Sequence, residues 1–299
     1  MSRFLIGKEE PRACESPEAD RTSHGRALKR RSRRPLSSLH WMWRQTIDEI
    51  EVMRVALPVR RLPRRLAGVV ACQISDFHID REEDLNRLKQ AVSTINREHP
   101  DLVFLTGDYF SARDTMRRYI GHFGRVLAEL KPAGGIFAIA GNHDHSSSFW
   151  TIARALRESG VRVLANENHS LDLRGEHLFI VGIDDLSSRH AEPARAFRGV
   201  GPEDCTIVLA HNPDTAPYTR HLEPGVMLSG HTHGGVVRIP FYGSPIRSFL
   251  RIGRQFYAGL NRYGDFYIYT NRGLGTFPLR VRINCRPEVS RFKLTLLTE

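Results

Sequence analysis

The stretch VVACQISDFH, at residues 69–78, contains an apolar run of strand length that ends directly in polar residues. Such a run is typical of a buried β-strand. The pattern recurs, because later apolar runs end in TGD at 106–108, GNHD at 141–144, AHN at 210–212 and SGHTHGG at 229–235. In an α/β sheet, ligands bind beyond the carboxyl ends of the strands. We therefore expect these five strand ends to form one crevice.

The segments around these strand ends alternate between strand and helix up to about residue 160. Apolar periodicity predicts strands at 51–57, 68–75, 101–106 and 135–140, and helices at 83–98, 115–130 and 148–159. Beyond residue 160, short strands dominate, at 161–164, 178–182, 206–209, 226–229, 266–270, 280–284 and 290–297. This order predicts an α/β (α+β) fold in which two mixed sheets pack face to face under outer helices, a four-layer α/β/β/α sandwich.

The basic character of the chain is concentrated near its N-terminus. Of a formal net charge of +11, residues 1–66 contribute +8, with 16 basic and 8 acidic side chains, and residues 67–299 contribute +3. Composition predicts a disordered basic tail over 1–34. Apolar spacing predicts an amphipathic helix over 35–49, which either attaches to an anionic membrane surface or packs on its own domain. A single domain is expected from 50 to 299.

Composition also limits the compartment and the partners. No apolar run reaches the ~18 to 20 residues that a membrane-spanning helix needs. The four cysteines form no C-x-x-C pair, which predicts neither a zinc ribbon nor a disulfide framework and favours a reducing compartment. We therefore expect a cytoplasmic chain with peripheral contact to the inner face of the plasma membrane. Nucleic acid is not an expected partner, because the basic segment contains no recognised nucleic-acid-binding motif.

The polar residues at the strand ends are nitrogen and oxygen donors without a thiolate. They are Asp76, His78, Asp108, Asn142, His211, His231 and His233. This donor set suits Mn, Fe, Zn or Mg. Seven ligands are too many for one tetrahedral ion and fit two ions that share a carboxylate. The sequence therefore predicts a dinuclear metal site at the carboxyl ends of the strands.

In this order, the five motifs resemble those of the calcineurin-like metallophosphoesterase superfamily: D-x-H, G-D-x-x-D, G-N-H-[DE], a lone H and G-H-x-H. The resemblance covers about residues 50–297. QISDFH at 73–78, SGHTHGG at 229–235 and NRGLG at 271–275 are similar to its YkuE/YaeI-like bacterial branch. Relatives of that branch include UDP-2,3-diacylglucosamine pyrophosphatases.

The resemblance implies a role for each matched residue. One ion would be held by Asp76, His78, Asp108 and His233, and the other by Asp108, Asn142, His211 and His231. A hydroxide between the ions would attack phosphorus. His143 would assist the leaving group, with Asp144 as support. The implied cofactor is a pair of divalent ions, Mn²⁺ first, with Fe, Zn or Mg as alternatives.

Two further features bear on the substrate. Ser111 stands where many relatives have an aspartate that orients the catalytic histidine, which favours pyrophosphates over alkyl phosphomonoesters because a phosphate leaving group needs less proton assistance. The stretch 238–257 is rich in arginine and aromatic residues. We expect Arg238, Arg247, Arg251 and Arg254 to bind a phosphate or diphosphate at the substrate mouth. The alternative is an ordinary surface hairpin.

The leading functional hypothesis is a dinuclear metal-dependent phosphoesterase that hydrolyses a phosphodiester or pyrophosphate bond. Its first candidate substrate is lipid-linked, such as UDP-2,3-diacylglucosamine at the membrane surface. One alternative is a soluble phosphodiesterase acting on cyclic or other nucleotides. The other is a non-catalytic metal-binding scaffold, which does not explain why the chain has all seven ligands.

Overall fold

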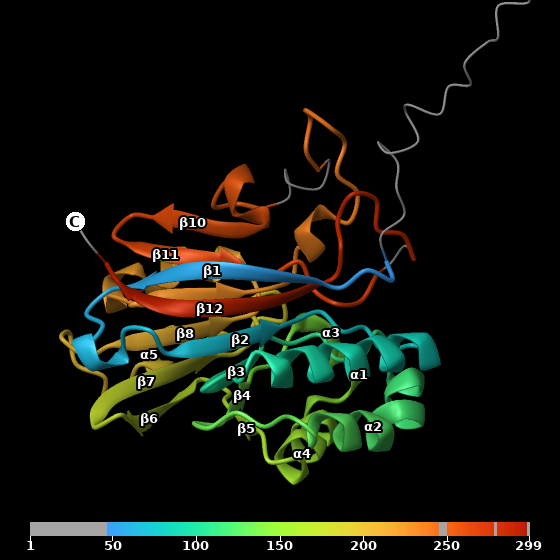
Figure 1. The fold of residues 1–299 in the computed structure, drawn as a ribbon, viewed down its shortest axis with the longest axis horizontal. Helices are drawn as coiled ribbons and strands as arrows, with labels where there is room; N and C mark the ends of the chain where they lie inside the picture. Colours follow the sequence, from blue (N-terminus) through green and yellow to red (C-terminus); the bar gives the residue numbers. More distant parts are fainter. Residues whose placement is uncertain (1–46, 245–249, 278–279, 298–299) are drawn as a thin grey trace, which may run out of the picture. The chain divides into compact units, whose positions relative to one another are not determined.

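The computed structural model describes residues 47–244, 250–277 and 280–297. All of them belong to one compact unit of the chain, which begins at Leu39. The predicted tail at 1–34, nearly all of the predicted helix at 35–49 and Arg247 lie outside the described residues. Within this unit, two six-stranded mixed sheets pack against each other and carry helices on their outer faces (Figure 1). This is the predicted α/β sandwich.

The first sheet has the order β1-β12-β2-β3-β4-β5. Its strands are β1 (Glu51–Val59), β12 (Glu288–Leu296), β2 (Val70–Ile74), β3 (Leu102–Leu105), β4 (Ile136–Ala138) and β5 (Arg162–Val163). Strands β2 to β5 are parallel. All four residues of β3 are apolar and buried, as expected for a parallel strand covered on both faces. The carboxyl ends of β2, β3 and β4 therefore open at the same edge.

The second sheet has the order β10-β11-β9-β8-β7-β6. Its strands are β10 (Gly259–Tyr263), β11 (Phe266–Thr270), β9 (Val226–Ser229), β8 (Thr206–Ala210), β7 (Glu176–Ile183) and β6 (Glu167–Leu173). The central strands β11, β9, β8 and β7 are parallel, and the edge strands β10 and β6 are antiparallel to their neighbours. The carboxyl ends of β8 and β9 thus also share an edge.

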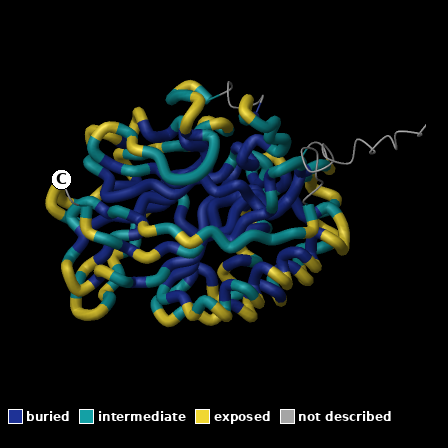
Figure 2. Tube along the Cα trace, turned by 45° about the horizontal axis from the view of Figure 1, so that its top comes forward, coloured by how far each residue is buried: buried dark blue, intermediate teal, exposed yellow. Residues whose placement is uncertain are grey.

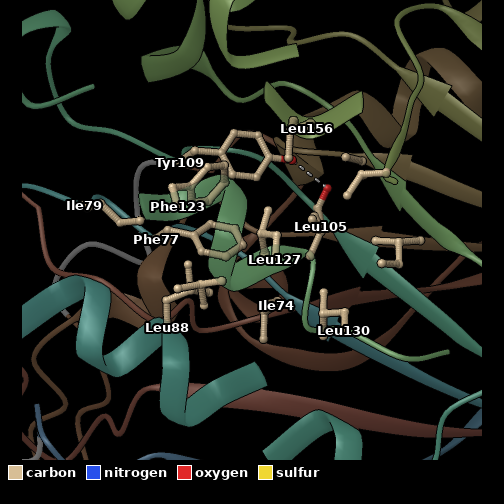
Figure 3. Close-up of a cluster of buried hydrophobic side chains, with 14 of the residues drawn as sticks. Ile74, Phe77, Ile79, Leu88, Leu105, Tyr109, Phe123, Leu127, Leu130 and Leu156 are labelled. Atoms are coloured by element: carbon tan, nitrogen blue, oxygen red, sulfur yellow. Dashed lines mark hydrogen bonds between the residues drawn. The ribbon is translucent and has the colours of Figure 1, made fainter. Parts of the chain in front are cut away.

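Three helices cover the first sheet: α1 (Glu82–Arg97), α2 (Arg113–Leu127) and α4 (Phe149–Glu158). On α1, Leu85, Leu88, Val92 and Ile95 are buried at helical spacing. They join an apolar cluster in which Phe77 packs edge-on against Phe123 at a centroid distance of 6.1 Å (Figure 3). This cluster holds the loop after β2 against the helices.

The other apolar clusters lie between the sheets and outside the second sheet. The outer one includes residues of the short helices α5 (Pro193–Ala196) and α6 (Ala216–Thr219). Burial is concentrated along the strands, and exposed residues lie mainly in the turns and on the outer helix faces (Figure 2). Cys72, Cys205 and Cys285 are free and buried. Among the described residues, no helix is both long and apolar enough to cross a bilayer.

The structure differs from the predicted elements at the C-terminal side. The predicted strand at 280–284 is wrong: only Ile283 pairs, in an isolated bridge to Val237. Apolar and polar residues alternate around Arg282 as they do in a strand. Its guanidinium, however, is buried and donates to the backbone oxygens of Arg272, Gly273 and Gly275. The edge strands β6 and β10 and the short helix α3 (Asn142–Ser147) were not predicted.

Candidate metal centre

The structure brings the seven predicted ligands together at the edge where the strands end. Asp76 and His78 follow β2, Asp108 follows β3, Asn142 opens α3, His211 follows β8, and His231 and His233 follow β9, with His233 opening the 3₁₀-helix η5 (His233–Gly235). Donor atoms lie within 4.8 Å of one another in three groups: Asp76 with His78 and His233; His78 with Asp108 and His143; and Asp76 with Asp108 and His211. Both sheets thus contribute to one cluster.

Asp108 occupies the centre of this cluster. Its Oδ2 lies 3.5 Å from Nε2 of His78 and 3.2 Å from Nε2 of His211. Two further pairs of candidate ligands lie close together in the cluster. Nε2 of His233 lies 3.5 Å from Oδ1 of Asp76, and Nδ1 of His231 lies 2.9 Å from Oδ1 of Asn142. Asp108 thus lies between the two pairs, and Asp76 approaches both Asp108 and His211 in one of the donor groups.

The backbone is strained at most of the candidate ligands. Asp76, His78, Asp108, His231 and His233 have φ values of 48°, 44°, 57°, 71° and 52°. A non-glycine residue in this left-handed region costs about 1–2 kcal/mol. Five such residues in one cluster are evidence that their side chains are aimed by a functional requirement rather than by local preference.

Glycines give the carboxylates the space they occupy. A Cβ on Gly141 would lie 2.3 Å from Oδ1 of Asp108, and one on Gly230 would lie 2.4 Å from Oδ2 of Asp76. Any side chain at either position would displace a candidate ligand. The glycines of the G-N-H-D and G-H-x-H motifs therefore serve the site directly.

Asp144 joins two of the loops through the backbone. Its buried carboxylate accepts hydrogen bonds from the N–H groups of Asp108 at 2.8 Å, Tyr109 at 2.9 Å and Gly141 at 2.8 Å. Burial and the charge of Asp108 raise the pKa of Asp144 to about 7. The support that the motif predicts for Asp144 is thus a brace on the main chain around Asp108.

Electrostatics prepare several of these residues for ligation. Burial lowers the pKa of His78 to about 3 and that of His231 to about 4, and it lowers the pKa of His233 well below its usual value. Burial opposes ionisation of Asp108, but the neighbouring His211 outweighs it and holds the pKa of that carboxyl below its usual range, while Asp108 in turn raises the pKa of His211 above its usual value. At neutral pH His78, His231 and His233 are therefore neutral, as imidazole ligands must be, and Asp108 is ionised.

The donor set fits a pair of divalent cations. The buried Nε2 atoms of His78 and His211 face Asp108 without making a hydrogen bond. Nδ1 of His211 lies 2.7 Å from the backbone oxygen of Thr106, which leaves its Nε2 available as a ligand atom, as second-shell hydrogen bonds do in metal sites. Unpaired imidazole nitrogens around a central carboxylate are the arrangement expected of ligands to ions such as Mn, Fe or Zn.

Ser111 contacts a different histidine from the one that the family pattern suggests. Its Oγ lies 3.2 Å from Nδ1 of His78, and the His143 ring is packed instead by Phe277, at a centroid distance of 4.4 Å. Phe277 also stacks on His78 at 5.1 Å and 9°. Phe277 was not predicted, because a single aromatic residue in a glycine-rich loop carries no periodic signal.

Replacing Ser111 with alanine is expected to weaken metal binding about 10- to 100-fold, because the Ser111 hydroxyl fixes the orientation of the His78 ring. The expected result is a higher Mn²⁺ concentration for half-maximal turnover with a similar maximal rate. Metal titrations of the wild type and the variant measure this. Ser146→Ala, which removes an exposed hydroxyl bonded to the backbone oxygen of His143, is the control, and an equal shift in both variants would contradict the role of Ser111.

Arg282 is a second residue that the sequence did not reveal. Its buried guanidinium donates to the backbone oxygens of residues 272, 273 and 275, and burial lowers its pKa to about 10. In the same loop, the N–H of Gly275 donates to the oxygen of Asp76 at 2.7 Å. Arg282 thereby supports the strained backbone that carries Asp76.

A cavity of about 680 Å³ adjoins the cluster beside His231. Its lining includes Arg189, Arg251, Tyr218 and Tyr257. Arg251 was predicted at the substrate mouth, whereas Arg189, in the loop after β7, was not. Within the described parts of the chain neither guanidinium makes an ion pair, so both are available to an anion.

The other predicted substrate arginines lie elsewhere. Arg238 donates from Nε to the oxygen of Gly234, and its guanidinium covers the Tyr257 ring at 5.4 Å. It therefore supports the cavity wall. Arg254 is exposed and is not part of the lining, and Arg247 lies outside the described residues.

Comparisons with known proteins agree with this geometry. The sequence model for the Calcineurin-like phosphoesterase family matches residues 71–235. Phosphodiesterase YaeI of Escherichia coli is 34% identical over 224 residues, covering 74% of this chain and 80% of YaeI. The uncharacterized metallophosphoesterase YkuE of Bacillus subtilis is 32% identical over 247 residues, covering 82% of this chain and 85% of YkuE.

A third relative carries a more specific description. The UDP-2,3-diacylglucosamine pyrophosphatase LpxG of Chlamydia trachomatis is 26% identical over 307 residues, covering 84% of this chain and 92% of LpxG. The matched segment of the family model contains all seven candidate ligands. The chain therefore belongs to the calcineurin-like phosphoesterase family, whose members use a dinuclear metal site, and it is a metal-dependent hydrolase.

Proposed function

We propose that this hydrolase cleaves the diphosphate bond of a lipid-linked nucleotide, such as UDP-2,3-diacylglucosamine, at the surface of an anionic membrane. The observation that carries the proposal is the cavity beside His231, where the guanidinium groups of Arg189 and Arg251 make no ion pair with any described residue. A diphosphate presents a second anionic group next to the reacting phosphorus, and a guanidinium binds such a group through paired hydrogen bonds. The similarity to LpxG supports the same substrate class.

In this proposal, Asp76, His78, Asp108 and His233 hold one divalent ion, and Asp108, Asn142, His211 and His231 hold the other. The bound ions supply Lewis acidity toward the phosphoryl oxygens and lower the pKa of water. Mn²⁺ is the first candidate, ahead of Fe, Zn and Mg. The protein contributes ligands that are already held in place by the strained backbone and by the Asp144 brace.

His143 is positioned to transfer a proton to the leaving group. Its backbone N–H donates to Oδ1 of Asp108 at 2.8 Å, and Phe277 packs against its ring at a centroid distance of 4.4 Å. Ser111, at the motif position where many relatives have an aspartate, contacts His78 and not the His143 ring. The proposal therefore favours a leaving group that needs little proton assistance, and the phosphate released from a diphosphate, with its low pKa, is one.

A nucleotide phosphodiesterase is the second candidate. The observation in its favour is the pair Tyr218 and Tyr257 in the cavity lining, because aromatic rings offer stacking surfaces for a base. A substrate panel with Mn²⁺ decides between the candidates: UDP-2,3-diacylglucosamine in mixed micelles, cyclic nucleotides and an aryl phosphodiester. Preferred turnover of a cyclic nucleotide would reject the diphosphate proposal.

Arg189→Gln and Arg251→Gln are each expected to raise the KM for a diphosphate substrate about tenfold or more, since a hydrogen bond to a charged group contributes about 1.5–3 kcal/mol. The KM for an aryl phosphodiester, which carries one phosphate, should change by less than about threefold. Arg198→Gln is the matched control, because Arg198 is exposed outside the cavity. Equal effects on both substrates would argue against a second phosphate in this cavity.

The proposed site of action is the inner face of the plasma membrane. The basic segment at 1–34 and the helix predicted from sequence at 35–49 remain a proposed attachment segment ahead of the catalytic domain. Co-sedimentation with vesicles containing phosphatidylglycerol tests this segment. Neutralising Arg30, Arg31, Arg33 and Arg34 together should weaken the binding if the segment contributes.

A further inference from the structure

The segment between β9 and β10 carries an exposed aromatic turn. Phe241 is 105% exposed and Tyr242 is 55% exposed. They lie in the turn at 240–242, which projects near the top of Figure 1, in orange. Two aromatic side chains exposed side by side form a small apolar patch, and patches of this kind mark contact surfaces for proteins or membranes.

Hydrogen bonds hold the backbone on both sides of the turn. Ile239 and Gly243 exchange backbone hydrogen bonds of 2.9 and 2.8 Å below the tip. On one side, the N–H of Arg238 donates to the oxygen of Ile283 at 2.9 Å. On the other side, the buried hydroxyl of Ser244 donates to the oxygen of Gly235 at 2.8 Å. The tip is therefore presented to solvent by a fixed stem.

The segment around the turn contains many more basic than acidic residues. Residues 224–287 contain nine arginines, no lysine and a single acidic side chain, Asp265. Residues 67–223 contain 17 basic and 22 acidic side chains. Three of these arginines, Arg272, Arg280 and Arg286, pair with acidic residues outside the segment, and Arg282 is buried. Arg251 and Arg254, by contrast, are exposed and make no ion pair with any described residue.

The aromatic turn lies next to the mouth of the cavity. Arg238, which precedes the turn, covers the ring of Tyr257, and Tyr257 lines the cavity together with Arg251 and His231. Phe241 and Tyr242 do not line it. A surface that held the turn would therefore lie beside the opening of the cavity.

We propose that the aromatic turn at 240–242 and the neighbouring arginines dock on the surface of an anionic lipid bilayer. Aromatic side chains favour the interface between headgroups and acyl chains, and arginines are attracted to anionic headgroups. The occupant is a membrane rather than an acidic protein, because the most exposed side chain of the turn is a hydrocarbon ring on a protruding tip rather than in a groove. Docking places the cavity next to the headgroups. The inference rests on the proposed function only for the reason why this protein would bind a membrane.

The test compares binding of the full-length chain to vesicles of phosphatidylcholine with 0 to 30% phosphatidylglycerol, by co-sedimentation. The double variant Phe241→Asp/Tyr242→Asp is expected to lower the partition coefficient about tenfold or more at 30% phosphatidylglycerol. Trp150→Asp is the matched control, because Trp150 is 78% exposed on α4, at the outer face of the first sheet. Turnover of an aryl phosphodiester in solution should stay within about twofold of the wild type in both variants.

Wild-type partitioning of the double variant at every lipid composition would overturn the docking. So would an equal loss in Trp150→Asp, which would indicate a nonspecific effect of charge. A dimer in sedimentation analysis that the double variant dissociates, without vesicle binding by the wild type, would assign the turn to a second copy of the chain instead. Vesicle binding needs no substrate, so failure of the diphosphate proposal in the substrate panel leaves this result unaffected.

Discussion

Asp108→Ala is expected to lower kcat/KM by about a thousandfold or more. Loss of a neighbouring hydrogen-bond partner of a metal ligand costs about 10- to 100-fold. Asp108 should cost more, because it lies in two of the three donor groups and faces both His78 and His211. Among the described carboxylates, only Asp108 lies within 4.0 Å of both imidazoles; Asp76 is farther from His211 and His78 and makes its close contact with His233. Turnover of an aryl phosphodiester with added Mn²⁺ measures the effect.

Metal content provides an independent readout of the same variant. We expect the wild type to bind two ions per chain by mass spectrometry, to lose turnover after treatment with a chelator and to regain it when Mn²⁺ is returned. Asp108→Ala should bind fewer ions and regain nothing. Asp114→Ala is the control, because this carboxylate is exposed in the first turn of α2. An Asp108→Ala protein with wild-type turnover would remove Asp108 from the centre of the site.

The ligand cluster could be predicted because each of its members follows a strand with a local signature. The runs ending at Ile74, Leu105 and Ser229 are apolar and short, and the polar residues after them stand out against this background. In parallel strands the carboxyl ends meet at one edge. Local pattern and sheet geometry were therefore enough to bring Asp76, Asp108 and His231 together.

The residues that support the cluster could not be predicted in the same way. Arg282 reaches Asp76 only through the loop at 272–275, more than 190 positions away in the sequence. Its contacts are with backbone oxygens, and every residue has one, so the amino-acid types in the loop do not reveal these contacts. Phe277 likewise acts by packing on His78 and His143. Tertiary packing, rather than periodicity, determines both contacts.

Ser111 shows where a sequence motif and a spatial contact diverge. The motif position suggested an effect on His143, but the Ser111 hydroxyl meets Nδ1 of His78. A serine side chain is shorter than the usual aspartate and carries no charge, so the residue at this position can act only by a local hydrogen bond. Arg189 was missed for a different reason: its loop follows β7 and so obeys the strand-end rule, but it contains no motif that attracted notice.

Asp144→Ala is expected to cause the largest loss of stability. The substitution leaves three buried N–H groups without an acceptor, and each such group costs about 1–3 kcal/mol. A loss of several kcal/mol lowers the Tm of a domain of this size by on the order of 10 °C, at roughly 2–4 °C per kcal/mol. Thermal unfolding followed by circular dichroism measures it.

The stability contributed by the Asp144 hydrogen bonds must be measured separately from the stability contributed by bound metal. Because bound ions stabilise the folded chain by mass action, the Tm is compared with a chelator present, where ligand loss cannot contribute. Asp144→Asn keeps one acceptor oxygen and should lose about half as much Tm, and Asp114→Ala should stay within about 1 °C of the wild type. If Asp144→Ala melts with the wild type under chelation, the three backbone hydrogen bonds do not hold the Asp108 loop, and its strained conformation must be maintained by other contacts.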